Sequence, residues 1–379
     1  MKNKISWCSS CLNMSTRPRI SFDDQGRCNA CLWAEEKRSI DWSVKLDLLE
    51  EILFKHRSKD GSFDCLVPVS GGKDGSHVAY NLKHKFGMNP LTVTIRPALE
   101  LELGNKNLEN FRNSGYDHMH ISPNPKAMQF LNKMGFIEKG FPYYGWLIAI
   151  QAAPLQVAKN YGIGLVFYGE DGEIEYGGGK ETKDNPLYTI DYMKRVYLEG
   201  GYEKVLNLVE GKGMNTGFFK FPELQNNDSL SITHWSYFEN WNPYNNYISA
   251  KTNCGLEESE DTNQGTFTNF AQNDQALYSL HAYLMYLKFG FGRATQDAGI
   301  EIRRGSMQRD QALNLVRMYD NFYPEPFIEM YLKYFEMSKY EFDEVLDKWT
   351  NKNLFEKIDG IWSPKFEVGT DFEYEDRGS

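Results

Sequence analysis

Apolar residues in the first half of the chain follow two alternating spacings. Short apolar runs bounded by turn residues predict strands at residues 66–69, 91–95 and 165–168, and residues 118–121 continue the alternation after a helix. Between these runs, apolar residues at helical spacing predict helices near 77–86, 106–113, 126–136 and 146–161. Strands that alternate with helices favour a parallel sheet covered by helices on both faces, which is an α/β fold.

The remaining segments predict a small module on each side of this core. A helix over residues 42–56 is expected to pack the first forty residues onto the sheet domain. Residues 180–270 show weak periodicity and are interpreted as an insertion that covers the pocket. Later helices are expected near 274–289 and 309–321, and Ser338 with Glu341 forms a capping box for a helix through Trp349. The predicted domains are therefore 1–58, 59–308 and a C-terminal helical region, 309–379.

Composition and charge narrow the class of protein. The 379 residues suggest two or three domains, and 41% hydrophobic and 25% charged residues are ordinary for a globular enzyme. The net charge of −10 makes a nucleic acid an unexpected partner, because polyanion binding needs a basic surplus. The N-terminal residues lack an apolar signal region, and residues 276–291 are too short and polar to span a bilayer. We expect a cytoplasmic protein without a membrane partner.

Four of the six cysteines form two CxxC pairs, Cys8 with Cys11 and Cys28 with Cys31. In a cytosolic chain this spacing predicts a Cys₄ zinc site, which would be structural because sulfur fills all four tetrahedral positions. A redox pair and an iron–sulfur site remain alternatives. Cys65 lies in an apolar run and is expected in the core, and Cys254 is isolated.

The loop Ser70–Ser76, Ser-Gly-Gly-Lys-Asp-Gly-Ser, lies between a predicted strand and a predicted helix. Free backbone N–H groups at a helix N-terminus attract anions, and glycine lets the backbone approach a phosphate closely. The spacing differs from the Walker loop. Arg96 and residues 169–173 follow other predicted strands, so one pocket could unite them with this loop.

This loop resembles the PP-loop of the ATP pyrophosphatases, with Gly75 as an extra residue before the serine. Proteins with that loop cleave ATP between the α and β phosphates and use AMP to activate an oxygen. The resemblance implies a PP-loop ATPase core and an ATP site. The predicted ATP-binding residues are Ser70, Gly71, Gly72, Lys73, Asp74, Gly75, Ser76, Arg96, Gly169, Arg293 and Thr295.

Several stretches together resemble the N-acetyl sugar amidotransferase family of bacterial surface-polysaccharide and flagellar-sugar biosynthesis. They are the two CxxC pairs, residues 15–18, 70–76, 169–178 and 286–304, continuing through Gly305, Arg309, Asp310, Tyr319 and Asp320. The resemblance implies an ATP-dependent, AMP-forming conversion of a sugar N-acetyl group to an acetamidino group. The implied substrate is a nucleotide-linked N-acetylated sugar acid or a nonulosonic acid of the pseudaminic type.

The implied chemistry assigns roles to residues in the loop and in the acidic run after residue 169. Lys73 is expected at the α and β phosphates, and Asp74 at Mg²⁺ or in loop geometry. Glu170, Asp171 and Glu173 are candidates to orient Mg²⁺, position the amide or accept a proton. A solvated loop is the alternative for this acidic run.

Other candidates lie outside these two segments. Arg293, Thr295 and Asp297 could complete the nucleotide site or form a structural salt bridge. Trp235, Tyr237 and Trp241 are candidates for stacking on the substrate, and the alternative is an aromatic core. Arg17, His234 and His281 are weaker candidates, since isolated histidines are usually structural.

The resemblance also implies an external ammonia source. It predicts separate glutaminase and cyclase-like subunits, similar to the pair in the histidine pathway. The chain itself offers no glutaminase nucleophile, because residue 2 is Lys and Cys254 lacks a nucleophile-elbow setting. Two other functions remain open: a tRNA-modifying thiolase with the same loop, and a noncatalytic nucleotide-binding scaffold.

Overall fold

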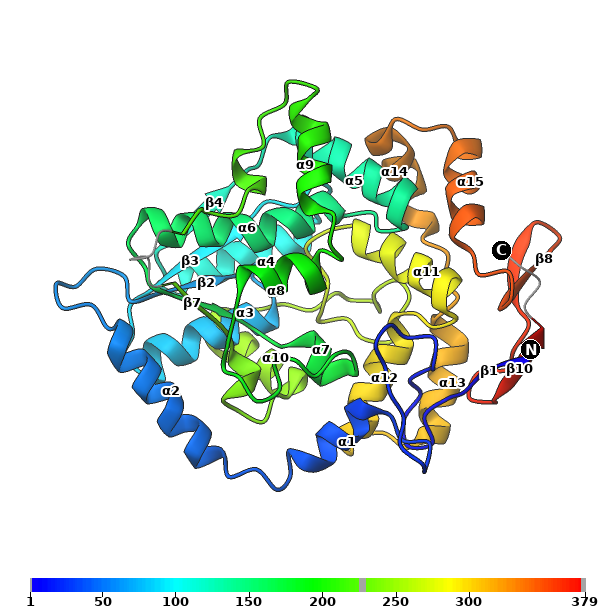
Figure 1. Ribbon diagram of the computed structural model, residues 1–379, viewed down its shortest axis with the longest axis horizontal. Coiled ribbons are helices and arrows are strands. Elements are labelled where there is room, and N and C mark those ends of the chain that lie inside the picture. The colour runs from blue at the N-terminus through cyan, green and yellow to red at the C-terminus, as the bar shows by residue number, and fades with distance from the viewer. Residues whose placement is uncertain (1, 225–229, 376–379) are drawn as a thin grey trace.

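A computed structural model describes residues 2–224 and 230–375. A six-stranded sheet has the order β4-β3-β2-β5-β7-β6, in which all neighbours are parallel except the edge strand β6 (Figure 1). The α/β prediction is confirmed. The strands are β2 (Cys65–Pro68), β3 (Pro90–Ile95), β4 (His118–Ile121), β5 (Leu165–Tyr168), β6 (Leu187–Tyr188) and β7 (Ser231–His234).

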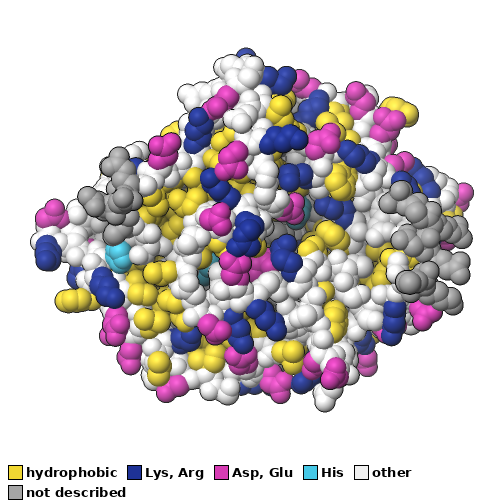
Figure 2. All heavy atoms as spheres, in the orientation of Figure 1, with side chains coloured by type: hydrophobic (Ala, Val, Ile, Leu, Met, Phe, Trp, Pro, Cys, Tyr) yellow, Lys and Arg dark blue, Asp and Glu magenta, His cyan; other side chains and the backbone are white. Residues whose placement is uncertain are grey.

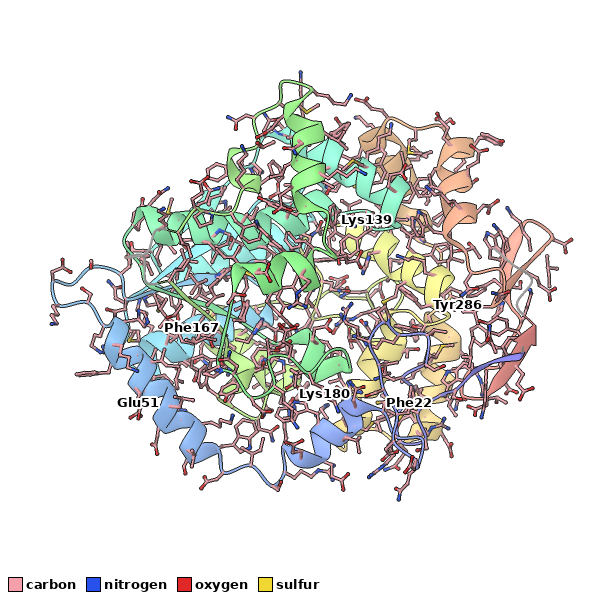
Figure 3. All side chains as sticks on the ribbon, viewed as in Figure 1. Phe22, Glu51, Lys139, Phe167, Lys180 and Tyr286 are labelled. Atoms are coloured by element: carbon pink, nitrogen blue, oxygen red, sulfur yellow. The ribbon has the colours of Figure 1, made fainter. Side chains whose placement is uncertain are left out.

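Alternate residues of the central strands enter separate cores on the two faces of the sheet. Leu66 and Val166 belong to the core under α5 and α6, whereas Val67 and Phe167 belong to the core under α2, α3 and α4. Phe167 is fully buried (Figure 3). Strands buried on both faces read as continuous apolar runs, which is why they were predictable. The helices are α2 (Trp42–His56), α3 (Lys73–Tyr80), α4 (Glu102–Asn113), α5 (Pro125–Lys139) and α6 (Tyr144–Asn160).

The segment interpreted as an insertion contributes directly to the sheet. β7 pairs in parallel with β5, so the 180–270 region is in part a continuation of the core. Its sequence, Ser-Ile-Thr-His, has one aliphatic residue, and the buried Thr233 hydroxyl donates to the Pro186 carbonyl at 2.5 Å. Such a strand lacks the usual apolar signal. The helices here are α7 (Gly172–Tyr176), α8 (Ile190–Tyr192), α9 (Tyr202–Glu210) and α10 (Pro243–Cys254).

The C-terminal helices share one hydrophobic core with residues near the N-terminus. β1 (Lys2–Ile5) pairs antiparallel with β10 (Phe372–Glu375), which places both described ends of the chain side by side (Figure 1). The capping box at Ser338 and Glu341 is confirmed. The other elements are α1 (Asn29–Glu36), α11 (Leu277–Phe289), α12 (Arg293–Arg303), α13 (Arg309–Tyr319), α14 (Ile328–Phe335), α15 (Lys339–Trp349), β8 (Phe355–Ile358) and β9 (Ile361–Pro364).

The surface in Figure 2 mixes basic and acidic side chains. Lys and Arg residues are interspersed with Asp and Glu across this face and form no extended basic stripe on it.

None of the helices in residues 2–224 and 230–375 has the length and apolar character needed to cross a membrane. The division into domains at residues 58 and 308 stays a prediction.

Candidate functional site

The strand order places a crevice beside the glycine loop. From β2 the chain adds β3 and then β4 on one side, and it then returns to add β5 on the other side of β2. The order of the strands therefore reverses between β2 and β5. Ligands of open α/β sheets bind at such a switch point, beyond the carboxyl ends of the strands. The loop after β2 carries Ser70–Gly72, and the turn after β5 carries Gly169–Asp171.

Two glycines of the loop have no room for a side chain. Gly71 has φ +81°, and a Cβ atom there would lie 2.4 Å from the backbone nitrogen of Leu108 in α4. A Cβ atom on Gly75 would lie 2.7 Å from the carbonyl oxygen of Pro68. These contacts hold the loop against α4 and the end of β2, with the N-terminus of α3 beginning at Lys73. The extra glycine of the motif therefore has a packing function.

A cavity of about 250 Å³ opens in front of this loop. One wall is the loop itself, and the opposite wall comes from residues 268–274 and from α12. Tyr176, Tyr244 and Tyr278 supply aromatic surface. The polar lining residues are Ser70, Lys73, Asp74, Asn107, Glu170, Thr268, Gln272, Asn273, Asp274, Arg293, Asp297 and Glu301.

Lys73 and Asp74 form an ion pair at the start of α3. The other carboxylate oxygen of Asp74 accepts a hydrogen bond from Nδ2 of Asn246 at 3.0 Å, and Asn246 is buried in α10. α10 thus fixes the Asp74 carboxylate, while the flexible Lys73 ammonium can exchange that carboxylate for a phosphate.

Glu170 is the one member of the acidic run 170–175 that lines this cavity. Burial raises the pKa of Glu170, and the nearby Asp74 carboxylate raises it further. Its Oε1 atom lies 3.4 Å from the hydroxyl of Tyr176, which donates to it. Burial and the charge of Glu170 hold the pKa of Tyr176 well above its ordinary value. Glu170 therefore favours its protonated form more than an exposed glutamate does.

The carboxylates of Asp171 and Glu173 bind other parts of the chain and do not face the cavity. Asp171 caps α7 by accepting from the Glu173 N–H at 3.0 Å, and its other oxygen accepts from the Thr182 hydroxyl. Glu173 forms a bidentate pair with Arg19, at 2.6 and 2.7 Å, and accepts from the Gly179 N–H. Both carboxylates shape the turn and do not line the cavity.

Arg293 and Asp297 lie on one face of α12 and both line the cavity. They form an ion pair at 2.8 Å, and Asp297 also accepts from the Thr266 hydroxyl at 2.6 Å. Burial lowers the pKa of Arg293, but Asp297 more than offsets this, so the guanidinium stays charged. Thr295 binds the buried Asp320 through its backbone N–H and its hydroxyl, at the N-terminus of α12, and does not line the cavity.

Several other predicted residues also lie outside the cavity. Arg96 pairs with Glu100 at the surface, and Trp235 packs in the core against Phe86 and Phe167. Tyr237 stacks beneath Lys45. Gly169 contacts the loop region, since a Cβ atom there would lie 3.3 Å from Cβ of Asp74.

The weaker candidates have structural surroundings. His234 stacks on Tyr188 with ring centroids 4.2 Å apart, and His281 packs against Phe141 and Tyr143. Burial lowers the pKa of His281 to about 3. Burial and the charge of Arg303 lower the pKa of Arg17 to about 10.

The four cysteines of the CxxC pairs converge on one point. The sulfur atoms of Cys8, Cys11, Cys28 and Cys31 all lie within 4.8 Å of one another. Two of the sulfur separations are 3.7 and 3.8 Å. A tetrahedral zinc site with Zn–S bonds of about 2.3 Å has sulfur atoms about 3.8 Å apart. The cluster therefore has the ligand set and spacing to hold a metal ion.

The cysteine cluster is tied to both walls of the cavity. Asn13 donates to Sγ of Cys28 and to the carbonyl of Tyr176, and Asn29 donates to the carbonyl of Gly178 at 2.8 Å. From α12, Arg303 lies 3.8 Å from Sγ of Cys11. Lys180, just beyond the acidic turn, lines a small cavity together with residues of α1 (Figure 3). The module thereby links the turn after β5 to α12.

Sequence reasoning missed three lining or supporting residues: Asn246, Asp274 and Tyr176. Asn246 lies in the segment without clear periodicity, and no motif marks it. Burial raises the pKa of Asp274 to about 6, and its Oδ2 atom has no hydrogen-bond partner among the described residues. Tyr176 belonged to a matched stretch and could have been chosen for its position beside the acidic run.

The part of the chain that matches a known protein family includes the cavity wall opposite the glycine loop. Residues 264–367, about a quarter of the chain, match the family described as "LPS biosynthesis protein WbpG-like, C-terminal domain". The chain carries a WbpG-like C-terminal domain. This WbpG-like domain supplies residues 268–274, Arg293 and Asp297 of the cavity, so the matched region is part of the site.

Similar proteins are known over shorter or looser matches. An uncharacterized protein of Methanocaldococcus jannaschii is 33% identical over 89 residues, and the match spans 23% of this chain and 32% of that relative. The U34-tRNA thiolase NcsA of Methanococcus maripaludis superposes with a TM-score of 0.32 at 10% identity, over 70% of this chain and 79% of that chain. A predicted subunit of a tRNA methyltransferase from Methanocaldococcus jannaschii superposes with a TM-score of 0.22 at 18% identity, over 46% of this chain and 83% of that chain. Because these TM-scores are low, the α/β fold is assigned from the strand order and pairing of the sheet and not from these two structures.

Replacing Glu170 by Gln is expected to stabilise the fold at neutral and alkaline pH. A carboxyl whose pKa is raised by folding binds its proton more tightly in the native state. Native stability therefore falls as pH rises from the unfolded pKa, about 4.3, through the raised native value. Glutamine carries no charge and removes this loss.

Thermal unfolding at pH 5 and pH 8 tests this expectation. The gain of Glu170→Gln over wild type should be larger at pH 8. Glu51→Gln, on the outer face of α2, is the matched control and should show no such trend (Figure 3). A gain that is equal at both pH values would contradict the assignment of a destabilising charge to Glu170.

Proposed function

We propose that this protein is an ATP-dependent, AMP-forming amidotransferase that converts the N-acetyl group of an acidic sugar to an acetamidino group. The observation that carries the proposal is the cavity itself. A glycine loop that resembles the phosphate-binding PP-loop lines one side, and a WbpG-like C-terminal domain lines the other. Nucleotide and sugar would meet between them.

The reaction would proceed in two balanced steps. The acetamido oxygen attacks the α-phosphorus of ATP, pyrophosphate leaves, and the amide N–H proton is lost, which gives an O-adenylyl imidate. Ammonia then adds to the imidate carbon, and AMP leaves with the former amide oxygen. Adenylation is needed because an amide oxygen is otherwise a poor leaving group.

The lining residues suit these steps. The N-terminus of α3 and Lys73 would bind the α and β phosphates, and Arg293 would approach from α12. Asp74 and Glu170 offer the oxygen ligands that Mg²⁺ prefers, and Mg²⁺ would stabilise the charge of the departing pyrophosphate. Glu170 would also be a candidate to accept a proton, since burial raises its pKa above that of an exposed glutamate.

The ammonia would come from solution or from a partner. Outside the metal cluster the chain has two cysteines, Cys65 and Cys254, and both are buried. Burial raises the pKa of the Cys254 thiol to about 11. Neither thiol resembles the activated nucleophile of a glutaminase. Separate glutaminase and cyclase-like subunits therefore remain our proposed partners.

The cysteine cluster would hold structural Zn²⁺. Four sulfur ligands leave no open coordination position for a water molecule, so the metal would take no part in the chemistry. Its contribution would be to fix the module that joins the acidic turn to α12.

The reaction products test the proposal directly. The purified protein, given ATP, Mg²⁺, ammonium and an N-acetylated nucleotide sugar acid, should release AMP and pyrophosphate in equal amounts. Mass spectrometry should show the sugar lighter by about one mass unit, as oxygen is replaced by NH. Release of ADP and phosphate would exclude adenylation, and nucleotide binding without turnover would indicate a scaffold.

Lys73→Ala should reduce turnover at least about a hundredfold, because electrostatic groups at transferring phosphates are typically worth that much. Lys55→Ala, on the exposed part of α2, is the control and should retain wild-type turnover. Unfolding curves of both variants should match wild type within about 1 kcal/mol. Wild-type turnover by Lys73→Ala would show that the phosphates bind elsewhere.

Elemental analysis should give about one zinc per chain. Cys11→Ser should lose most of that metal and unfold at lower temperature, because the binding energy of a structural zinc is folding energy. Cys254→Ala is the control and should keep its zinc. A full complement of iron with sulfide, or no metal, would contradict the zinc assignment.

A further inference from the structure

A second cavity of about 200 Å³ adjoins the first one. Tyr176, Pro243 and Ile300 line both cavities and form the boundary between them. The second chamber lies between α1, α7, the start of α10 and the end of α12. It is the region where the cysteine module meets the two walls of the site.

The second chamber is strongly basic although the chain is acidic. Four basic side chains line it, Lys37, Arg38, Arg303 and Arg304, against the single carboxylate of Glu175. The net charge of the whole chain is −10. A surplus of cations inside a concave site focuses a positive potential there and attracts anions.

Arg38 leaves charge available for a ligand, whereas Lys37, Arg303 and Arg304 already have partners, which for Arg303 is Sγ of Cys11 at 3.8 Å. Lys37 pairs with Glu175 at 2.6 Å. Arg304 pairs with Glu301 and lies over the ring of Tyr244, and both of those residues belong to the first cavity. Arg38 makes no ion pair with any residue in the described ranges, and it is exposed at the chamber rim. A guanidinium without a carboxylate can bind a phosphate or carboxylate bidentately.

The other walls of the chamber are aromatic and amide-bearing. Trp33 and Trp241 line it, together with Asn240 and Asn242. Aromatic faces stack on nucleobases, and arginine forks bind diphosphates. Trp241 was a sequence candidate for stacking, and it lies on this chamber and not on the first cavity.

We propose that the second chamber binds the anionic part of the sugar acceptor, so that the acetamido group reaches across Tyr176 to the nucleotide in the first cavity. This inference rests on the proposed function. Two sources of the anion share this chemistry, the diphosphate of a nucleotide sugar and the carboxylate of a sugar acid. Trp33, half-buried on α1, suits the first source, because a nucleoside diphosphate brings a base to stack, whereas Trp241 packs in the core with 4% of its surface exposed.

Calorimetric titration can test the chamber without turnover. The first cavity is filled with Mg²⁺ and the α,β-methylene analogue of ATP, and the protein is then titrated with UDP or with D-glucuronate. Arg38→Gln and Arg304→Gln should each weaken the binding about tenfold, which corresponds to about 1.4 kcal/mol. Arg112→Gln, at the surface end of α4 and paired with Glu109, is the control and should bind as wild type does.

The two titrants separate the two sources. UDP binding that the arginine variants weaken assigns the chamber to a diphosphate, and the same pattern for D-glucuronate alone assigns it to a carboxylate. Binding of neither titrant, or binding that Arg38→Gln and Arg304→Gln leave unchanged, would overturn the proposal. Because the readout is binding, normal titrations combined with no AMP release would count against the proposed reaction and not against the chamber.

Discussion

The close approach of Gly71 to the backbone of α4 is the constraint on which the site depends. A side chain at this position would overlap α4, and the positive φ would be strained for any residue other than glycine. The approach holds the loop after β2 against α4, and the turn after β5 lies beside the start of α3, since a Cβ atom on Gly169 would lie 3.3 Å from Cβ of Asp74. Free N–H groups of α3, Lys73 and Glu170 therefore face one volume. If the loop moved outward by one side chain, the walls supplied by α12 and residues 268–274 would no longer face it.

The cysteine module acts on the same geometry from outside. It has little core of its own, with four buried residues that include three of the cysteines. Its contacts go instead to the acidic turn, through Asn13, Asn29 and the Arg19–Glu173 pair, and to α12 through Arg303. A tetrathiolate zinc centre carries two negative charges, so Arg303 would also balance that charge. The module thus joins the two halves of the site, and a structural metal bound by its cysteines would fix that connection.

The amino-acid sequence predicted the elements whose pattern of apolar, polar and capping residues lies within the element itself. β2, β3 and β5 are apolar runs buried on both faces, and α2 and the capping box at Ser338 have regular spacing, whereas β4 is an edge strand in which only Ile121 is buried. β7 was missed because its sheet position is set by pairing with β5, while its own four residues include Thr233 and His234. The acidic run shows the same limit at the site. Glu170, Asp171 and Glu173 are equivalent in sequence, yet only Glu170 lines the cavity, because Asp171 caps α7 and Arg19 binds Glu173. Arg19 comes from a distant part of the chain, and the capping role of Asp171 depends on where α7 begins.

The two chambers differ in charge: acidic side chains outnumber basic ones in the first, and basic side chains outnumber acidic ones in the second. In the first, Asp74, Glu170, Asp274, Asp297 and Glu301 are set against Lys73 and Arg293, a balance that would suit a site holding both phosphates and a metal cation. In the second, basic residues dominate. An anionic acceptor would be repelled by the carboxylates of the first chamber and attracted by the second, so its neutral acetamido group would be the part that enters beside the nucleotide. Electrostatics would then orient the acceptor before any specific hydrogen bond to the sugar forms, with Tyr176 at the boundary contacting both ligands.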